Sequence, residues 1–234
     1  MQRYFAKNEK LELQDTDIHH IKNVMRMSIN DKIEIIYNKK IYLCLIESIN
    51  PFQIKIVDNY QEERNLDIEL TIAISLVTEQ KFDLILQKLT ELGVHKIIPL
   101  RTERSIVKIT NDKVDKKIKR WNSICKEASE QSHRLDIPII TDIMTIKDLE
   151  HYNCKNKFIC SLTSDSKKIS TYINKENKEE MLFVIGPEGG ISDNENKILT
   201  SYGFKNITLG KRVLRVETAA ICIASIINYI YEGW

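Results

Sequence analysis

Apolar and polar positions along the first sixty residues predict a small, β-rich unit. Two apolar runs flank residues 38–40, which predicts a hairpin, and the alternation in 52–58 predicts a further strand. Between residues 16 and 27 the apolar positions instead recur at helical spacing, with Thr16 or Asp17 as the expected N-cap.

Beyond the polar, turn-rich segment 59–67 the pattern changes to strands that alternate with helices. Continuous apolar runs predict strands that are covered on both faces. The expected strands lie at 69–77, 94–100, 157–162, 181–186 and 205–210, and the expected helices at 79–93, 114–132, 192–203 and 217–231. This alternation predicts an α/β fold with a mostly parallel sheet and helices on both of its faces. We expect two domains, 1–66 and 67–234.

Single residues mark several helix ends. Gly93 and Gly203 are expected to stop the helices that precede them, and Ser192 with Glu195 has the spacing of a capping box. Trp121 lies on the apolar face of its helix, so packing in the core is favoured over stacking on a base.

Composition excludes some classes of protein. The 234 residues are 42% hydrophobic and 29% charged, with a net charge of +2, so bulk charge does not indicate a nucleic-acid binder. No apolar run approaches the roughly 20 residues that span a bilayer, and residues 1–10 lack a signal-peptide core. Five cysteines without a CxxC pair, and the adjacent His19 and His20, argue against disulfides or a metal site. We expect a reduced, cytoplasmic protein without a metal.

Two loops near the carboxyl end carry the candidate chemistry. Residues 185–190 read IGPEGG and place three of the chain's seven glycines between an apolar run and a polar helix start. Ligands of open α/β sheets bind beyond the carboxyl ends of strands, although a tight turn explains this loop alone equally well. It has neither the dinucleotide nor the P-loop pattern. The basic loop 209–215 follows the next strand, and the two loops together predict a single pocket.

Six ordered blocks make the chain resemble the RsmE family, bacterial enzymes of the SPOUT superfamily. The blocks are RYF from residue 3, HHIKNVMRM from 19, QKLTELGVHKIIPLRTERS from 87, RWNSICKEASEQSHR from 120, IGPEGGIS from 185 and LGKRVLRVETAA from 209. The chain departs from the family at Thr90, where alanine is frequent, and at His133, where the family usually reads QSGR. Both departures bear on RNA contacts more than on chemistry.

The resemblance implies a fold and a reaction. Family members methylate N3 of a specific uridine in 16S ribosomal RNA of the small subunit, use S-adenosylmethionine, and act as homodimers. They join an amino-terminal PUA-like β-barrel, which helps to hold RNA, to a SPOUT catalytic domain with a trefoil knot near its carboxyl end. Threaded chains are rare in general, so the expected knot depends on the resemblance alone.

The resemblance also implies the site that surrounds the bent cofactor. The expected cofactor-binding residues are Leu162, Ile185, Gly186, Pro187, Glu188, Gly189, Gly190, Leu209, Gly210, Val213 and Leu214. A side chain at Gly189 or Gly190 would intrude on the adenosine or force a strained backbone.

Arg215 and Glu217 are the candidate catalytic residues. Arg215 would stabilise the negative charge that develops on uracil, and Glu217 would orient the base. The alternative is a structural ion pair that braces the knot, and the two residues alone favour it slightly. In the two cofactor loops Lys211 is the one evident proton acceptor, and we expect it to be exposed.

A local basic stretch points to RNA. Residues 101–134 contain ten lysines and arginines against five aspartates and glutamates, a net +5 where the whole chain carries +2. Such a face suits an RNA backbone, although a solvated helix face is the usual explanation. Together with the resemblance, the candidate RNA contacts are Arg3, Arg26, Arg101, Arg104, Arg120 and Arg134.

Other functions stay open at this point. A non-catalytic RNA-binding or ribosome-assembly protein would bind RNA without the cofactor, and the intact glycine and basic loops count against it. A SPOUT methyltransferase that acts on another ribosomal or transfer RNA nucleotide would have the same loops. A nicotinamide dehydrogenase lacks its glycine fingerprint here.

Overall fold

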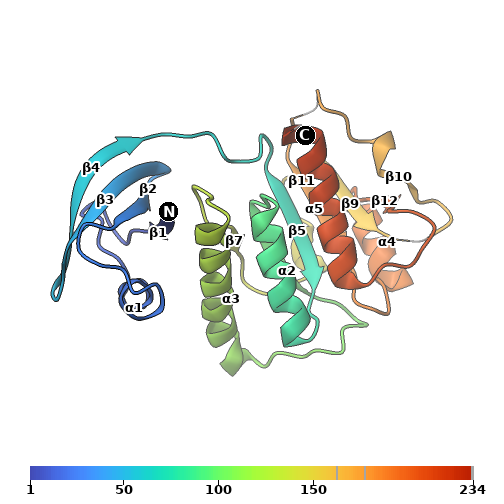
Figure 1. Ribbon diagram of the computed structural model, residues 1–234. Coiled ribbons are helices and arrows are strands. Elements are labelled where there is room, and N and C mark those ends of the chain that lie inside the picture. The colour runs from blue at the N-terminus through green and yellow to red at the C-terminus, as the bar shows by residue number, and fades with distance from the viewer. Residues whose placement is uncertain (162, 177, 233–234) are drawn as a thin grey trace. The chain divides into compact units, whose positions relative to one another are not determined.

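The computed structural model describes residues 1–161, 163–176 and 178–232, and the chain forms two compact units (Figure 1). The amino-terminal unit contains Met1–Asn65 and Lys126–Asp136, and the second unit contains Leu66–Cys125 and the chain from Ile137 onward. Residues 126–136 follow the expected boundary in sequence but pack with the amino-terminal unit. The division into domains 1–66 and 67–234 stays a prediction.

The amino-terminal unit contains a four-stranded sheet. Its strands, in spatial order, are β1 (Gln2–Phe5), β2 (Lys32–Tyr37), β3 (Lys40–Ile49) and β4 (Phe52–Tyr60). β1 pairs parallel with β2, and the other pairs are antiparallel. The predicted hairpin is confirmed, because Asn38 and Lys39 turn between β2 and β3 with φ of 48° and 61°. Closure of the sheet into a barrel stays a prediction.

The helix predicted at 16–27 is shorter and less regular than expected. It begins as α1 (Asp15–His19) and continues as the π-helical turn η1 (His20–Val24). Its N-cap is Gln14, which forms a capping box with Asp17, so the expected cap was wrong. The Asp17 carboxylate accepts a hydrogen bond from the Gln14 backbone amide at 3.2 Å, which satisfies the backbone at the helix start.

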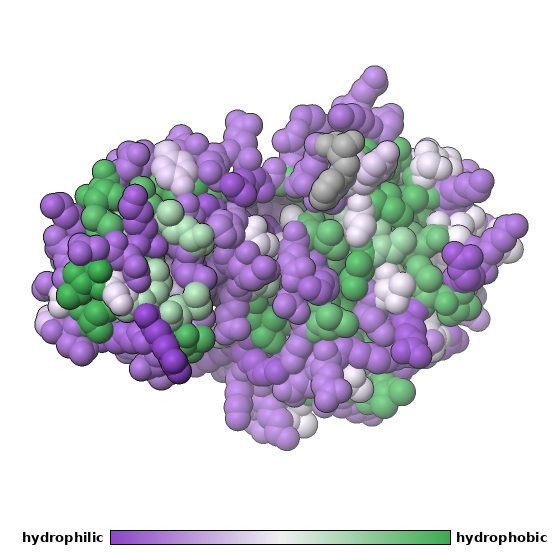
Figure 2. Space-filling view, viewed as in Figure 1, coloured by the Kyte–Doolittle hydropathy of each residue, from purple (hydrophilic) through white to green (hydrophobic). Residues whose placement is uncertain are grey.

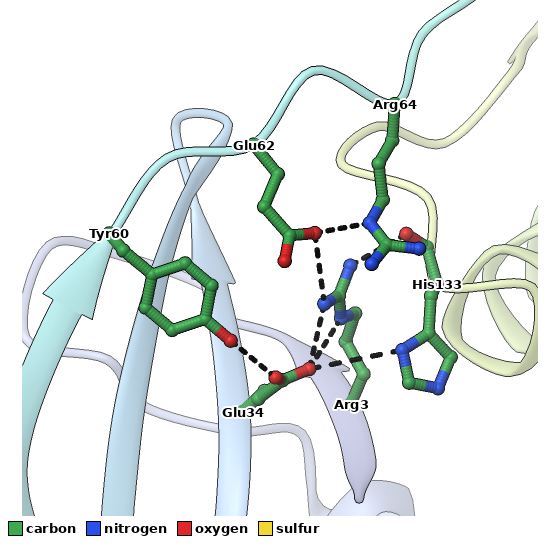
Figure 3. A network of polar contacts seen from close by, with 6 residues as sticks. All are labelled: Arg3, Glu34, Tyr60, Glu62, Arg64 and His133. Atoms are coloured by element: carbon green, nitrogen blue, oxygen red, sulfur yellow. Dashed lines mark hydrogen bonds and ion pairs between the residues drawn. The ribbon is translucent and has the colours of Figure 1, made fainter.

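A buried polar network ties β1 to the segment that follows the helix at 111–131 (Figure 3). The Arg3 guanidinium pairs with the Glu34 carboxylate at 2.7 Å and donates to the His133 carbonyl at 2.6 Å. The Tyr60 hydroxyl donates to the other Glu34 oxygen at 2.6 Å. The Arg3 side chain is 1% exposed, so its charge depends on these partners for stabilisation.

The second unit is a parallel sheet with helices on both faces. The order of its strands is β10-β12-β9-β11-β5-β6-β7, with β8 beside β6, and all described pairs are parallel. The strands are β5 (Leu70–Ser75), β6 (Lys96–Arg101), β7 (Ile139–Ile140), β8 (Met144–Thr145), β9 (Asn156–Cys160), β10 (Lys167–Lys168), β11 (Met181–Ile185) and β12 (Lys205–Thr208). The predicted α/β class is confirmed.

The helices cover two separate apolar cores. They are α2 (Glu79–Glu91), α3 (Asn111–Gln131), α4 (Asp193–Ser201) and α5 (Val216–Glu232), with short 3₁₀ turns η2 (Lys147–Leu149) and η3 (Ile169–Thr171). Ile72 and Ile74 of β5 point into the core under α2 and α5, which lie side by side in Figure 1, while Ala73 points into the core under α4. In the described part of the chain no helix is long and apolar enough to cross a membrane.

The predicted helix ends and core residues are confirmed. The Ser192 hydroxyl accepts from the Glu195 amide at 3.1 Å, and the Glu195 carboxylate accepts from the Ser192 amide at 3.0 Å. Gly93 and Gly203 follow their helices with φ of 82° and 86°. Trp121 is 3% exposed and packs on Phe82 with ring centroids 4.6 Å apart, so it is a core residue.

Strand register brings three chain segments to one edge of this sheet. Cys160 at the end of β9 pairs with Ile185 of β11 on one side and with Ile207 of β12 on the other. Because parallel strands end at the same edge, the loops that leave β9, β11 and β12 start side by side.

The Glu34 carboxyl should make the stability of the amino-terminal unit depend on pH. Burial would raise its pKa, but hydrogen bonds from Tyr60 and Arg3 outweigh burial and hold the pKa below the ordinary value of 4.5. A lowered folded-state pKa stabilises the native state above about pH 4.5, and this stabilisation is lost as the pH falls through the lowered value. We predict that Glu34→Gln lowers the free energy of unfolding at pH 7 by about 3 kcal/mol.

Denaturant unfolding at pH 7, 5 and 3.5 checks this prediction. The loss of stability between the two lower pH values should be smaller in Glu34→Gln than in the wild type. The matched control is Glu9→Gln, an exposed glutamate of the same unit, which should behave as the wild type does. Equal stability and equal pH dependence of Glu34→Gln and wild type would contradict the prediction.

Candidate active site

A cavity of about 330 Å³ opens where the loops after β9, β11 and β12 meet. Small-molecule sites typically measure about 300–1,000 Å³. Predicted cofactor residues in its lining are Ile185, Gly186, Pro187, Glu188, Gly189, Gly190, Leu209, Val213 and Leu214. Gly210 lies in the same loop but not in the lining. Leu162 lies outside the described residues, and its neighbours Ser161 and Thr163 both line the cavity.

The glycine loop needs its glycines for two different reasons. A Cβ on Gly186 would lie 2.8 Å from the Ile191 nitrogen, closer than real Cβ atoms come to backbone. Gly190 has φ of 70°, and its amide donates to the Pro187 carbonyl at 2.8 Å. A Cβ there would meet no described protein atom within 4 Å, so it would project into open space beside the cavity. Gly186 closes the turn, and Gly190 leaves room for a ligand.

Residues 102–105 brace the glycine loop from a neighbouring strand end. The Arg104 guanidinium donates to the Gly189 carbonyl at 2.9 Å, and the Glu103 amide donates to the Glu195 carboxylate at 2.8 Å. The Asn194 amide donates to the Glu103 carboxylate at 3.1 Å. The loop and the start of α4 are therefore held from outside, by contacts that span more than eighty residues of sequence.

Lys81 fixes the charged side chain of the loop. Its ammonium group, in the first turns of α2, pairs with the Glu188 carboxylate. The hydrogen bond from Lys81 lowers the pKa of Glu188, so a carboxylate stands at the cavity rim at neutral pH. No local pattern in the sequence marked Lys81, which lies 107 residues from its partner.

The two candidate catalytic residues lie at the start of α5, beside the cavity. Arg215 is exposed, and Val216 between the two residues lines the cavity. Among the described residues no ion pair joins Arg215 to Glu217, so the structure does not support the bracing pair. The Glu217 Oε2 atom is buried and has no hydrogen-bond partner in the described chain. Such an atom commonly awaits a ligand or a water molecule.

Two of the six candidate RNA contacts are interior residues. Arg3 is held in the network of Figure 3, and Arg134 is 7% exposed and pairs with Asp136 at 2.8 Å. Buried guanidinium groups with carboxylate partners have little surface to offer a phosphate, so the structure argues against both as RNA contacts. Their basic character was visible in the sequence, whereas their burial depends on contacts with distant segments.

The other four arginines lie closer to the surface, with different partners. Arg26 and Arg104 are exposed, and Arg101 donates to the Ile109 carbonyl at 3.0 Å. Arg120 is also exposed but pairs with Asp83 of α2, so the basic stretch is partly neutralised by a neighbouring helix. Arg104 contacts the glycine loop through the carbonyl of Gly189, which lines the cavity.

A thiol and a metal are the other groups that could supply chemistry. Cys160 lines the cavity, and burial, with a smaller contribution from Cys222, raises the pKa of its thiol to about 12. It is therefore a neutral wall residue at physiological pH rather than a nucleophile. Across the described ranges of the chain, no three histidine, cysteine, aspartate or glutamate side chains are grouped as a metal site requires.

Comparisons with known proteins agree with this geometry. Residues 63–228 match the family model described as an RNA methyltransferase domain, and residues 13–58 match the RNA methyltransferase PUA domain. The ribosomal RNA small subunit methyltransferase E of Bacillus subtilis is 33% identical over 250 residues, covering 99% of this chain and 98% of that protein. Its namesake from Mesomycoplasma hyopneumoniae is 33% identical, covering 94% and 96%.

Solved structures share the fold over the whole chain. A Legionella pneumophila methyltransferase in complex with S-adenosylmethionine is 29% identical, with a TM-score of 0.91, and the match covers 97% of this chain and 96% of that one. The ribosomal RNA small subunit methyltransferase E of Neisseria gonorrhoeae, bound to S-adenosylmethionine, is 28% identical with a TM-score of 0.88, covering 99% and 98%.

Together, the fold, the cavity and these matches define an RNA methyltransferase that carries an amino-terminal PUA domain. Within that class, the chain belongs to the family of the ribosomal RNA small subunit methyltransferases E, which confirms the resemblance to RsmE. The PUA-like and α/β parts of the predicted fold are confirmed with it, whereas the assigned site residues stay predictions.

The two glycines should respond differently to the same substitution. Gly186→Ala places a methyl group against backbone, so we predict a displaced loop and at least a tenfold weaker binding of S-adenosylmethionine. Gly190→Ala displaces no described protein atom; it costs about 1–2 kcal/mol of stability for the left-handed backbone, and it should weaken cofactor binding less than Gly186→Ala does, through the single methyl group that it adds at the cavity. Calorimetric titration and thermal unfolding of both variants check this. The prediction fails if Gly186→Ala binds the cofactor as tightly as Gly190→Ala does.

Proposed function

We propose that this protein transfers a methyl group from S-adenosylmethionine to N3 of a specific uridine in 16S ribosomal RNA of the small ribosomal subunit. We propose further that it acts in the cytosol as a homodimer. The observation that carries the proposal is the cavity at the ends of β9, β11 and β12, because the motif blocks of the family form two of its three walls. Family membership supports the RNA substrate.

The residues present fit the cofactor. Ile185, Leu209 and Leu214 supply apolar surface for an adenine ring, and the backbone of residues 186–190 can be approached closely. Glu188 offers a carboxylate that can accept hydrogen bonds from a hydroxyl or ammonium group. When bound, the cofactor supplies a methyl group on an electron-poor sulfonium. The chain's own task is to hold that group in line with a nucleophile.

The site must also bind the uracil base in a form that can react. Its N3 atom carries a proton and is paired in a helix, so the base must be unpaired and presented before it can react. Arg215 immediately precedes α5, and the amino-terminal end of a helix is the positive end of its dipole. An exposed guanidinium at that position can stabilise a uracil anion. The buried Oε2 atom of Glu217 can accept a hydrogen bond and so orient the bound reactant.

Positioning accounts for much of the expected rate. Holding two bound reactants in line can lower a barrier by roughly 7–11 kcal/mol. The described residues of the lining include no lysine or histidine; Cys160 has a raised thiol pKa, and Lys211 is exposed and outside the lining. The anion-stabilising role of Arg215 therefore carries the chemical part of the proposal.

The homodimer is supported by an apolar surface on the second unit. Figure 2 shows apolar side chains over α5 and its neighbours. Tyr229 of α5 is 65% exposed, and Val213 in the cavity loop is 81% exposed. Large exposed apolar patches mark interaction sites. A second copy seated there would cover α5, whose first turn lines the cavity.

The trefoil knot belongs to the same proposal. β12 lies beyond β9 in the sheet, whereas α5, which follows it in sequence, packs back against β11 and α2. The chain between them, 209–215, makes that return. A knot requires in addition that the chain pass through a loop, which the family resemblance implies.

The function is tested by cofactor titration combined with RNA mapping. We predict that the wild type binds S-adenosylmethionine and adds one methyl group to N3 of a uridine in small-subunit RNA, read by mass spectrometry of RNA digests. Binding of RNA without cofactor would favour the non-catalytic alternative. A methyl group on another nucleotide would favour a different substrate within the superfamily.

Arg215→Ala tests the chemical role. We expect the dissociation constant of S-adenosylmethionine and the unfolding temperature to stay near the wild-type values, while kcat falls about 100-fold, the typical loss when one anion-stabilising donor is removed. Lys211→Ala in the same loop is the matched control and should retain activity. Full turnover by a folded Arg215→Ala variant would show that the assignment is wrong.

Tyr229→Lys tests the dimer. A charge in the last turn of α5, on its exposed face, should convert the protein to a monomer, as measured by light scattering after size-exclusion chromatography. Ile139→Lys on the edge strand β7, which is 49% exposed, serves as the control and should leave the mass unchanged. A dimer that survives Tyr229→Lys, or a monomeric wild type, would contradict the proposed interface.

A further inference from the structure

A buried amide stands behind the cavity, outside every motif block. Asn206 lies in β12, is 6% exposed, and pairs in register with Ile159 of β9. Its position in the strand would suit an ordinary apolar residue, since β12 packs on both faces. A polar side chain buried at such a place is costly unless all its hydrogen bonds are made.

The Asn206 side chain makes four hydrogen bonds, which use its full capacity. Its Oδ1 atom accepts from the Ser161 hydroxyl at 2.9 Å and from the Asn196 amide at 2.8 Å. Its Nδ2 group donates to the Asp165 carboxylate at 3.0 Å and to the Asn196 Oδ1 atom at 3.3 Å. A side-chain amide can accept two hydrogen bonds and donate two, and Asn206 makes all four.

The partners come from the walls of the cavity. Ser161 and Asn196 both line it, the first after β9 and the second in α4, which follows the glycine loop. Asp165 belongs to the segment that follows β9, where Thr163 and Ser166 also hydrogen-bond to each other at 2.9 Å. Asn206 itself stands in the strand that leads into the third wall, 209–214. One amide thus joins the segments that build all three walls.

We propose that Asn206 is a positioning residue for cofactor binding, which holds the segment after β9, the start of α4 and the end of β12 at a fixed spacing. It touches no reactant and acts through Ser161 and Asn196. The proposal rests on the proposed function, because it assumes that the cavity binds S-adenosylmethionine.

The chemistry of the cluster explains why an amide is required there. Asp165 is exposed, and hydrogen bonds from Thr163 and then Asn206 lower the pKa of its carboxyl group. An aspartate at position 206 would place a second carboxylate against Asp165 with no donor between them. An alanine would leave the Ser161 and Asn196 side chains without their shared partner.

The test measures affinity and stability separately. In Asn206→Asp and Asn206→Ala, the dissociation constants of S-adenosylmethionine and S-adenosylhomocysteine should rise about tenfold or more, by calorimetric titration. The double variant Asn206→Asp with Asp165→Asn restores a donor opposite the new carboxylate. It should return the dissociation constant to within about threefold of the wild type.

The matched control removes a buried amide far from the cavity. Asn228 of α5 is also 6% exposed and donates to Glu232 at 2.8 Å. Asn228→Ala should lower the unfolding temperature, as Asn206→Ala does, without changing the affinity for the cofactor. A purely structural role of Asn206 would lower stability in both variants and leave both affinities unchanged.

The outcomes separate this inference from the proposed function. If the wild type binds the cofactor and the Asn206 variants bind it equally well, the positioning role is wrong and the function stands. If the double variant binds no better than Asn206→Asp, the donor and acceptor argument fails. If the wild type does not bind the cofactor, both the function and the inference are overturned.

Discussion

Parallel pairing of β9 between β11 and β12 is the constraint on which the site depends. The register places Cys160 opposite both Ile185 and Ile207, so three strands end at one level. Each end then continues into a different wall of the cavity. This order places the segment after β9 between the glycine loop and the basic loop. The sheet order therefore turns two short motifs into one pocket.

Side chains around that edge hold the loops in place from several directions. Arg104 supports the glycine loop from the segment after β6, Lys81 holds Glu188 from α2, and Asn206 joins the walls from behind. The Lys81–Glu188 pair is partly exposed to solvent, whereas the Asn206 side chain is buried. A pocket so braced is preorganised, which favours binding because less order must be imposed by the ligand.

The sequence predicted the elements whose residues carry their own local evidence. The long apolar runs, the capping box at Ser192, the positive-φ glycines after α2 and α4, and the buried Trp121 all follow from periodicity or from one side chain. The two-residue strands β7, β8 and β10 were missed because their pairing depends on neighbours, and the Gln14 cap because glutamine rarely performs that role. His133, where the resemblance to RsmE leads us to expect glycine, has a φ of 59°, a backbone conformation that favours glycine.

The sequence predicted the loops that form the cavity, but not the residues that hold those loops in place. Motif blocks located the glycine and basic loops, whereas Lys81, Asn206 and the true place of Arg3 depend on partners far away in sequence.

The most direct measurement is a crystal structure of the protein with S-adenosylmethionine. We predict density for the cofactor in the cavity, against Gly190 and between Ser161 and Leu214. Cofactor bound elsewhere, with this cavity empty, would contradict it.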